Sequence, residues 1–574
     1  MGFLSKYKNK YSKSFCLAVF FVMCETVCDL MLPTVMVEII DVGVASKDMN
    51  YILSMGGLMV LITILGFASA TARNLISSQV SQKFGTELRS DLYRKIQHLS
   101  FEKIDQLDRA SLVTRLTNDV IQVQNFVNGL MRIFIKAPLL CIGSLLMAIR
   151  LNSNLALILA VVVPVVGVFI VVNMKMGYPL FSKVQQALDL VNGVMREYLS
   201  GIRVVKAFNR FDYEVNKFNK ANTELQVRSV ASMRLMSIFS PGILMSVNTG
   251  IAAVLWFGGV QVNSGDMQSG QVIAFINYMA QMLFSLMLMS MVFNMFVRAK
   301  SSAERIHEVL SQDGNMTWEK NRMEDKGIKG RVDFENVYFS YEGTLESPVL
   351  KNVTLTCMPG EMIGVIGATG SGKSSLVHLI PRFYDITSGS LKVNGEKISS
   401  INPQVIREKI AVVGQKTVLF TGTVIENIRW GKEDATLEEI EIAAKIAQVH
   451  DFIMELPEGY ETRVGQGGVN FSGGQKQRIS IARALVRNPE ILILDDSTSA
   501  VDVVTEKKIK ESLKRYTAHL TCFMIAQRVT SVMDADKIVV LDQGEIVGIG
   551  KHDELLQSCA VYQEILKSQV GKVM

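Results

Sequence analysis

The sequence has little charge for its length. Of its 574 residues, 20% are Asp, Glu, Lys or Arg, whereas 49% are hydrophobic. This composition excludes a disordered chain, which would be poor in apolar residues, and it argues against a single soluble domain of this size. The net charge of +6 combines two halves of opposite sign. Residues 1–300 hold 28 basic and 17 acidic residues, whereas residues 301–574 hold 32 basic and 37 acidic residues. We therefore expect an apolar, basic half, an ordinary soluble half and no nucleic-acid partner.

Cysteines are few and carry no metal-binding pattern. The seven cysteines are scattered, and none belongs to a C-x-x-C pair. This is typical of reduced, structural thiols and argues against a zinc or redox centre. The first apolar run also lacks the short hydrophobic region and small-residue cleavage site of a signal peptide, so Met1–Lys13 is interpreted as a basic cap.

Six apolar stretches are each long enough to cross a hydrocarbon core of about 30 Å. They cover residues 15–41, 52–79, 125–149, 155–177, 237–262 and 270–297. Lys and Arg gather in the two long connections, 80–120 and 174–236, whereas the short connections hold only Lys47 and Arg150. The positive-inside bias therefore predicts an α-helical membrane domain of six transmembrane helices over residues 1–300, with long helical cytoplasmic extensions and both termini in the cytoplasm.

Three charged residues inside these spans need an explanation, because an unpaired charge is costly in hydrocarbon. Glu25 and Asp29 lie four residues apart on one face of the first span, and Lys136 lies at a similar depth in the third. They form either a structural carboxylate–lysine pair or a polar patch of a transport cavity that favours cationic substrates. The sequence leaves both interpretations open.

The soluble half carries a phosphate-binding pattern. After a polar linker over residues 301–330, β-rich runs alternate with helical ones from 331 to 574, which predicts an α/β P-loop nucleotide-binding domain. The apolar strand Met362–Ile366 runs into G-x-x-x-x-G-K-S and then a helix, so backbone N–H groups can surround phosphate. The expected nucleotide-binding residues are Gly367, Thr369, Gly370, Ser371, Gly372, Lys373, Ser374 and Ser375.

Two further segments complete the expected site. The strand Ile491–Leu494 ends in Asp495, which together with the Ser374 hydroxyl is suited to hold Mg²⁺. A second Ser/Gly turn, Ser472, Gly473, Gly474 and Gln475, leads into a helix and offers another anion-binding helix start. ATP and Mg²⁺ are therefore the predicted cofactors.

With these motifs in this order, the chain resembles the ATP-binding cassette (ABC) exporters over essentially its whole length. The resemblance implies that Tyr341 stacks on adenine, that Gln415 contacts Mg²⁺ and the membrane domain, and that Ser472–Gln475 form the family signature. Ser499–Asp502 is similar to the D-loop, and Thr462–Gln466 to the exporter X-loop, although Gln466 stands where Glu is usual. The resemblance also implies coupling helices near 104–114 and 207–215 and two cassettes that close head to tail around ATP.

Two positions depart from the family pattern. Asp496 follows Asp495 where a Glu general base is usual, and Gln527 stands where a His is usual. Shortening the carboxylate by one methylene withdraws it by roughly 1 Å, and a misplacement of that size can cost about 10²-fold in rate. Gln527 cannot be protonated near neutral pH. With Asp496, Gln527 and Gln415 as its catalytic positions, this site is predicted to bind ATP and to hydrolyse it slowly.

An intact signature beside this weakened pair resembles the degenerate-site subunit of bacterial heterodimeric multidrug exporters. The resemblance implies ATP-driven efflux of drugs or other small lipophilic compounds by alternating access across the lipid bilayer of a bacterial cell membrane. The partner would be a second half-transporter with the catalytic Glu and His intact. The alternatives are a homodimeric exporter of lipid or peptide and a nucleotide-sensing regulatory membrane subunit.

Overall fold

The computed structural model describes residues 4–312, 318–319, 323, 329–344, 346–516 and 520–570, so residues 313–317, 320–322 and 324–328 of the expected linker over 301–330 lie outside the described residues. The chain divides into two units. One comprises Met1–Gln97 and Arg109–Gln312, and the other His98–Asp108 and Asp313–Met574. The order of a helical half and a soluble half is the expected one, but His98–Asp108 groups with the soluble half instead of with the membrane domain predicted over 1–300.

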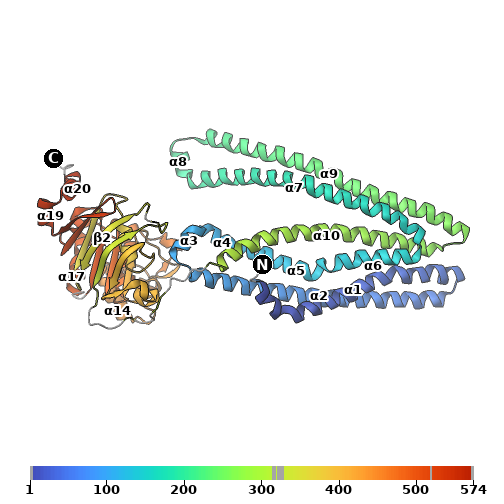
Figure 1. Cartoon of the computed structure of the whole chain (residues 1–574), viewed down its shortest axis with the longest axis horizontal. Helices are drawn as coiled ribbons and strands as arrows, with labels where there is room; N and C mark the ends of the chain where they lie inside the picture. The colour runs from blue at the N-terminus through green and yellow to red at the C-terminus, as the bar shows by residue number, and fades with distance from the viewer. Residues whose placement is uncertain are drawn as a thin grey trace. The chain divides into compact units, whose positions relative to one another are not determined.

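The first unit consists of long helices (Figure 1). Its helices are α1 (Leu4–Glu38), α2 (Met49–Gln97), α4 (Arg109–Thr114), α5 (Val120–Gly129), α6 (Lys136–Leu151), α7 (Ser153–Ser200), α8 (Ile202–Ala207), α9 (Phe211–Ser264) and α10 (Ser269–Leu310). Three π-helical segments, Ile39–Val44, Arg115–Asp119 and Leu130–Phe134, interrupt them. In the described residues, six helical stretches are long and apolar enough to cross a membrane, which confirms the six-helix fold class.

The helix α10 holds much of the first unit together. It packs against α1, α5, α6 and α9, and its residues Phe275, Tyr278 and Met279 are fully buried in the apolar core. The helices α7 and α9 pack mainly on each other, and in Figure 1 this pair diverges from α1, α2 and α10 towards α8. The hairpin formed by α7, α8 and α9 therefore ends in a tip that the rest of the unit does not cover.

A proline in the first span is compensated by side chains of the sixth. Pro33 lies inside α1 and cannot donate to the carbonyl of Asp29 one turn earlier. Gln281 Nε2 donates to this carbonyl at 3.2 Å, and the Tyr278 hydroxyl donates to the carbonyl of Leu30 at 2.7 Å. Since a backbone carbonyl in hydrocarbon must find its partner within the protein, these bonds allow a proline at this depth.

Four charged residues of the spans, Glu25, Asp29, Arg73 and Lys136, form one ion-paired cluster. Glu25 lies 2.8 Å from Arg73 Nη1 and 2.6 Å from Lys136 Nζ, and Lys136 Nζ lies 2.9 Å from Asp29. The Glu25 side chain is only 8% exposed. Arg73, in the second span, was missed by the sequence analysis, although a cation at matching depth was a signal. Because two cations already compensate the two carboxylates, the contacts favour a structural cluster over a patch that attracts cationic substrates.

The second unit is an α/β domain with three sheets. The strand orders are β12-β11-β3-β10-β9-β6, β2-β1-β4-β5 and β7-β8. The strands are β1 (Val332–Phe339), β2 (Leu350–Cys357), β3 (Met362–Gly367), β4 (Ser388–Val393), β5 (Glu396–Lys397), β6 (Ile410–Val413), β7 (Gly422–Thr423), β8 (Arg463–Val464), β9 (Ile491–Asp495), β10 (Thr521–Ile525), β11 (Lys537–Asp542) and β12 (Glu545–Gly550). The large sheet is parallel except for the edge strand β12.

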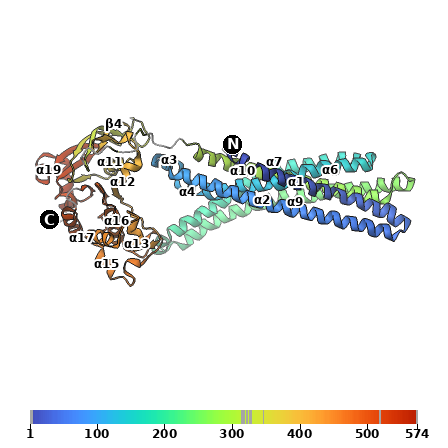
Figure 2. The ribbon, with the colours of Figure 1, turned by 90° about the horizontal axis from the view of Figure 1, so that it is seen from below.

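Helices cover these sheets and divide the domain into two cores. They are α11 (Lys373–Leu379), α12 (Pro403–Glu408), α13 (Val424–Arg429), α14 (Leu437–Ile446), α15 (His450–Met454), α16 (Gly473–Leu485), α17 (Val503–Tyr516), α18 (Val529–Val532), α19 (His552–Ser558) and α20 (Ala560–Val570). In Figure 2, β4 lies at one end of the domain and α13 and α15 at the other, with α11, α12 and α16 between them. One apolar core contains β1, β2, β4 and α11, and the other contains α13 to α16.

The short helix α3 (Phe101–Leu107) explains why His98–Asp108 belongs to the second unit. The Phe101 ring lies 4.8 Å from that of Phe383, and the Tyr384 hydroxyl donates to Asp105 Oδ2 at 2.7 Å. The helix α3 begins earlier than the range 104–114 in which a coupling helix was expected, and it ends at Leu107, because the φ of 56° at Asp108 breaks the helix.

The short helix near the second expected coupling range also differs from the expected one. It is α8 (Ile202–Ala207), which precedes the range 207–215 expected from the sequence. Asn209, with a φ of 50°, separates α8 from α9, so most of the expected range forms the start of the long helix α9.

Candidate nucleotide-binding site

The parallel strands bring the predicted site residues to one edge of the large sheet. In β10, Ile525 pairs with Val365 of β3 on one side and with Asp495 of β9 on the other. The carboxyl ends of these three strands therefore meet, and ligands bind at such edges in α/β sheets. The phosphate loop, Asp495 with Asp496, and Gln527 follow directly from them.

The phosphate loop after β3 is a backbone cradle that depends on glycine. A Cβ at Gly367 would lie 2.0 Å from the Leu541 carbonyl oxygen, so no side chain fits there. Gly372 has a φ of 97° and starts α11, a conformation that other residues rarely adopt. Within the described part of the chain, the buried Ser371 hydroxyl finds no hydrogen-bond partner. An open cradle with an unpaired hydroxyl fits the phosphate groups of a nucleotide.

Lys373 lies folded over this cradle. Its Nζ donates to the carbonyls of Gly367 at 2.9 Å and Ala368 at 2.8 Å. Burial lowers the pKa of Lys373, and the nearby carboxylates of Asp496 and Asp495 oppose this shift. The ammonium group is therefore positioned to exchange two loop carbonyls for phosphate oxygens.

Ser374 and Asp495, the expected Mg²⁺ ligands, meet in the structure. The Ser374 hydroxyl donates to Asp495 Oδ1 at 3.0 Å, and Asp495 is buried. His378 Nε2 lies 3.5 Å from the other oxygen of Asp495, a neighbour that the sequence analysis missed. A carboxylate and a hydroxyl are oxygen donors of the kind that Mg²⁺ prefers beside phosphate.

The three predicted catalytic positions form one hydrogen-bonded group. Gln415 Nε2 and Gln527 Nε2 both donate to Asp496 Oδ2, at 3.3 and 3.0 Å. Burial raises the pKa of the Asp496 carboxyl, opposed by the hydrogen bond from Gln415, and Asp495 raises it further. The raised pKa favours a general base, but the short side chain and its two amide donors hold the carboxylate back towards the protein.

Tyr341 lies beside the phosphate loop. Its hydroxyl is 2.9 Å from that of Ser375, and its ring makes edge contacts with Phe339 and, at 5.1 Å, with Tyr384. The side chain remains 43% exposed, which leaves ring surface for an adenine base. Tyr384 was not predicted, yet its hydroxyl also donates to Asp105 of α3, so it connects Tyr341 with α3.

The signature residues lie at the start of α16 and form a capping box. The Ser472 hydroxyl accepts from Gln475 N at 3.3 Å, and Gln475 Oε1 accepts from Ser472 N at 2.8 Å. A Cβ at Gly474 would lie 2.7 Å from the Ala500 carbonyl oxygen, so this turn packs on Ser499–Asp502. Among the residues that the structure describes, no hydrogen bond joins the signature to the phosphate loop of the same chain.

Comparisons with known proteins identify the family. The ABC transporter transmembrane region matches residues 15–286, and the ABC transporter domain matches residues 350–499. An uncharacterized ABC transporter ATP-binding protein of Bacillus subtilis (strain 168), YfiB, is 40% identical over 556 residues, which cover 97% of this chain and 96% of the relative. The chain belongs to the ABC transporter family. It is an exporter half-transporter with one membrane region and one ATPase domain, and hence an ATPase-coupled, multi-pass membrane protein.

Further ABC transporters match over most of their length. YgaD of Bacillus subtilis, which carries a multidrug-export name, is 33% identical over 586 residues, covering 99% of this chain and 98% of the relative. The ATP-dependent lipid A-core flippase of Syntrophus aciditrophicus is 32% identical over 514 residues, covering 89% and 84%. A bacterial Atm1-family ABC exporter with ATP bound has the same fold, with a TM-score of 0.80 over 98% of this chain and 99% of that one, at 23% identity.

Proposed function

We propose that this half-transporter is the degenerate-site subunit of a heterodimeric exporter, which moves drugs or other small lipophilic compounds out of a bacterial cell by alternating access. The observation that carries the proposal is the hydrogen-bonded group of Asp496, Gln415 and Gln527 beside an unaltered phosphate loop. Such a site retains what ATP and Mg²⁺ binding need, namely Lys373, Ser374 and Asp495, but lacks the usual base and its His.

The amide neighbours of Asp496 support slow hydrolysis at this site. A general base must reach the attacking water, and Asp496 is one methylene shorter than the Glu that is usual in the family. Gln527 can donate to phosphate but cannot take up a proton. ATP is therefore held for longer here than at a site with Glu and His, and a bound nucleotide biases the closed arrangement of two cassettes.

The unaltered signature supports a partner chain. Ser472 and Gln475 hold each other in a capping box, so the N-terminus of α16 is preorganised without ATP. ABC exporters work as dimers, and this signature can complete a site whose phosphate loop, Glu and His belong to another chain. In a homodimer both sites would be slow, which makes a homodimeric exporter of lipid or peptide the weaker alternative.

The hairpin tip at α8 supports a partner of the same architecture. Phe208 is 75% exposed, Val204 and Tyr213 are exposed beside it, and Asp212 and Glu214 lie in the first turn of α9. The same tip also carries Arg203, Lys206 and Arg210, so its exposed apolar side chains, and not its charge, require an apolar surface to cover them.

The nucleotide-binding domain carries such a surface. A groove of about 410 Å³ is lined by the exposed aromatic side chains Phe420 and Trp430 and by Arg407, Arg483 and Arg487, among others. The exposed apolar side chains at the tip of one chain match the aromatic lining of this groove on another chain.

The spans and the names of the relatives support the proposed cargo and orientation. Relatives carry a multidrug-export name and a lipid-flippase name, and both kinds of cargo are lipophilic. On α10, Phe284, Met287 and Met291 are exposed at helical spacing, and such flexible apolar side chains suit cargo of varied shape. Because Lys and Arg are concentrated in the long loops, both termini are placed on the cytoplasmic side of a bacterial cell membrane.

An assembly experiment tests the partner. The chain is expressed alone and together with the product of the adjacent gene, and the mass of each purified complex is measured. We expect a one-to-one complex with the partner, and we expect Phe208→Asp to prevent its formation, since a charge would enter an apolar contact. Met454→Asp, at an exposed position of α15, is the matched control. A stable symmetric dimer of this chain alone would contradict the proposal.

A further inference from the structure

The chain passes between its two units three times. The crossings lie at Gln97–His98, Asp108–Arg109 and Gln312–Asp313. On the membrane side they correspond to the end of α2, the start of α4 with the π-helical segment Arg115–Asp119, and the end of α10. The covalent path from the nucleotide-binding domain to the membrane helices therefore runs through these three segments.

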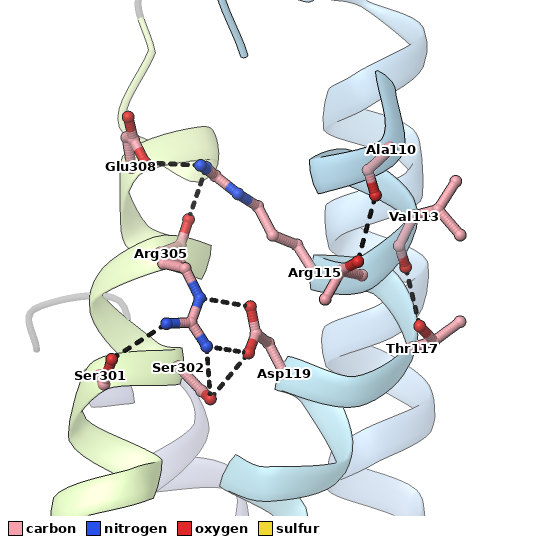
Figure 3. Close-up of polar contacts among 10 residues, drawn as sticks. Ala110, Val113, Arg115, Thr117, Asp119, Ser301, Ser302, Arg305 and Glu308 are labelled. Atoms are coloured by element: carbon pink, nitrogen blue, oxygen red, sulfur yellow. Dashed lines mark hydrogen bonds and ion pairs between the residues drawn. The ribbon is translucent and has the colours of Figure 1, made fainter. Parts of the chain in front are cut away.

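The second and third crossing segments are joined by a buried carboxylate (Figure 3). Asp119 is 0% exposed, and Arg305 of α10 forms a fork on it, with Nε donating to Oδ2 at 2.8 Å and Nη2 contacting Oδ1. The Ser302 hydroxyl donates to Oδ1 at 2.8 Å. Because an unpaired buried carboxylate is strongly disfavoured, α10 and this segment cannot separate there without a large cost.

Arg115 adds a second contact between the same segments. Its Nη1 donates to the Arg305 carbonyl at 2.9 Å, and its Nη2 lies 2.8 Å from Glu308 Oε2. The first crossing segment is attached as well, since Arg89 of α2 donates through Nε to the Leu116 carbonyl at 3.2 Å. We name Arg89, Arg115, Asp119, Ser302, Arg305 and Glu308 the crossing cluster.

The local backbone places Arg115 and Asp119 in a π-helical turn, of which they are the first and last residues. The Thr117 hydroxyl donates to the Val113 carbonyl at 2.8 Å and competes with the backbone for it (Figure 3). Such turns are rare inside helices and are frequent at functional positions. Here both ends of the turn bind α10.

We propose that Asp119, Arg305 and Arg115 are positioning residues for the coupling of ATP binding to transport, because the crossing cluster makes the three crossing segments move as one body. A displacement that enters at α3 or at the end of α10 then reaches α2, α5 and α10 together. The inference rests on ATP-driven coupling between the two units but not on the identity of the partner or the cargo. The inference is based on direct ion pairs and hydrogen bonds between packed helices, and not on a statistical correlation between residues.

Hydrogen exchange in the assembled complex tests this role without any cargo. Exchange is measured with and without ATP and Mg²⁺ in two peptides, one over the phosphate loop at 367–376 and one over the outer connection at 39–52. In the unaltered complex we expect both to respond to nucleotide. With Asp119→Asn or Arg305→Gln the phosphate loop is still protected, but the response at 39–52 is lost.

Two further variants separate positioning from folding. Arg305→Lys keeps the charge and is expected to restore part of the outer response, whereas Lys300→Gln, an exposed neighbour in α10, leaves it at its full size. If Asp119→Asn fails to assemble, Ser302→Ala and Glu308→Gln at the edge of the crossing cluster are expected to reduce the outer response.

Three outcomes distinguish the inference from the proposed function. An outer response of full size in the Asp119, Arg305, Ser302 and Glu308 variants overturns the inference. The inference is also overturned if, in the unaltered complex, ATP changes exchange in the phosphate loop but not in the peptide 39–52. A phosphate loop that ATP does not protect even in the unaltered complex contradicts the proposed function instead.

Discussion

Replacing Lys373 by Ala is expected to weaken ATP binding at this chain's own site by about 10- to 100-fold, since hydrogen bonds to charged groups contribute about 1.5–3 kcal/mol. Lys373 is the ammonium group that lies over the loop, within 2.9 Å of two of its carbonyls. Its removal takes a positive charge from a place where two carboxylates, Asp495 and Asp496, remain. Titration of the purified chain with a fluorescent ATP analogue measures the change.

A lysine elsewhere on the nucleotide-binding domain provides the control for this experiment. Lys507 lies exposed in α17, so Lys507→Ala removes the same charge without touching the loop. We expect it to bind the analogue with unchanged affinity. Equal affinity in Lys373→Ala and in the unaltered chain would show that nucleotide does not occupy this cradle.

The double change Asp496→Glu with Gln527→His is expected to raise ATP hydrolysis at this chain's own site by about 10²-fold, because it restores the reach of the base and a protonatable neighbour. Asp496 sits at a φ of 49°, a backbone conformation that Asp enters more easily than Glu, so part of the gain is lost to strain. The phosphate loop, Ser374 and Asp495 need no change, since their contacts are already in place.

The increase in hydrolysis at this chain's site can be measured only when the partner's site does not hydrolyse ATP. The steady-state ATPase rate is therefore compared in complexes whose partner carries Gln in place of its catalytic Glu. Gln527→His alone is the matched control and should give a much smaller gain, because Asp496 remains too short. If the double change leaves the rate unaltered while ATP still binds, side-chain length does not limit hydrolysis here.

Much of the fold follows from local patterns. Apolar runs of sufficient length predict the six spans, and the run Met362–Ile366 before a glycine-rich loop predicts β3 and the phosphate cradle. The meeting of Ser374 with Asp495 was predictable too, because parallel strands bring their carboxyl ends to one edge. The hydrogen bonds of Gln415 and Gln527 to Asp496 were not, since they depend on how separate loops cross that edge.

Contacts between distant helices were harder to predict. Arg73 lies in the second span, and its depth alone does not show that it contacts Glu25. Arg115 and Asp119 precede the third span and read as ordinary charges of a cytoplasmic loop, although the structure buries both against α10. Likewise, α3 lies within a long loop whose sequence does not show that Phe101 packs on Phe383.

The degenerate-site assignment is tested most directly by the ATPase turnover of this chain purified without a partner, measured before and after Asp496→Asn. The account predicts very little turnover for the chain alone. In the complex it predicts turnover that Asp496→Asn changes modestly and that Ser472→Ala nearly abolishes, because hydrolysis there uses this chain's signature and the partner's base. Appreciable turnover by the chain alone that disappears with Asp496→Asn would contradict the account and identify a homodimer in which Asp496 is the working base.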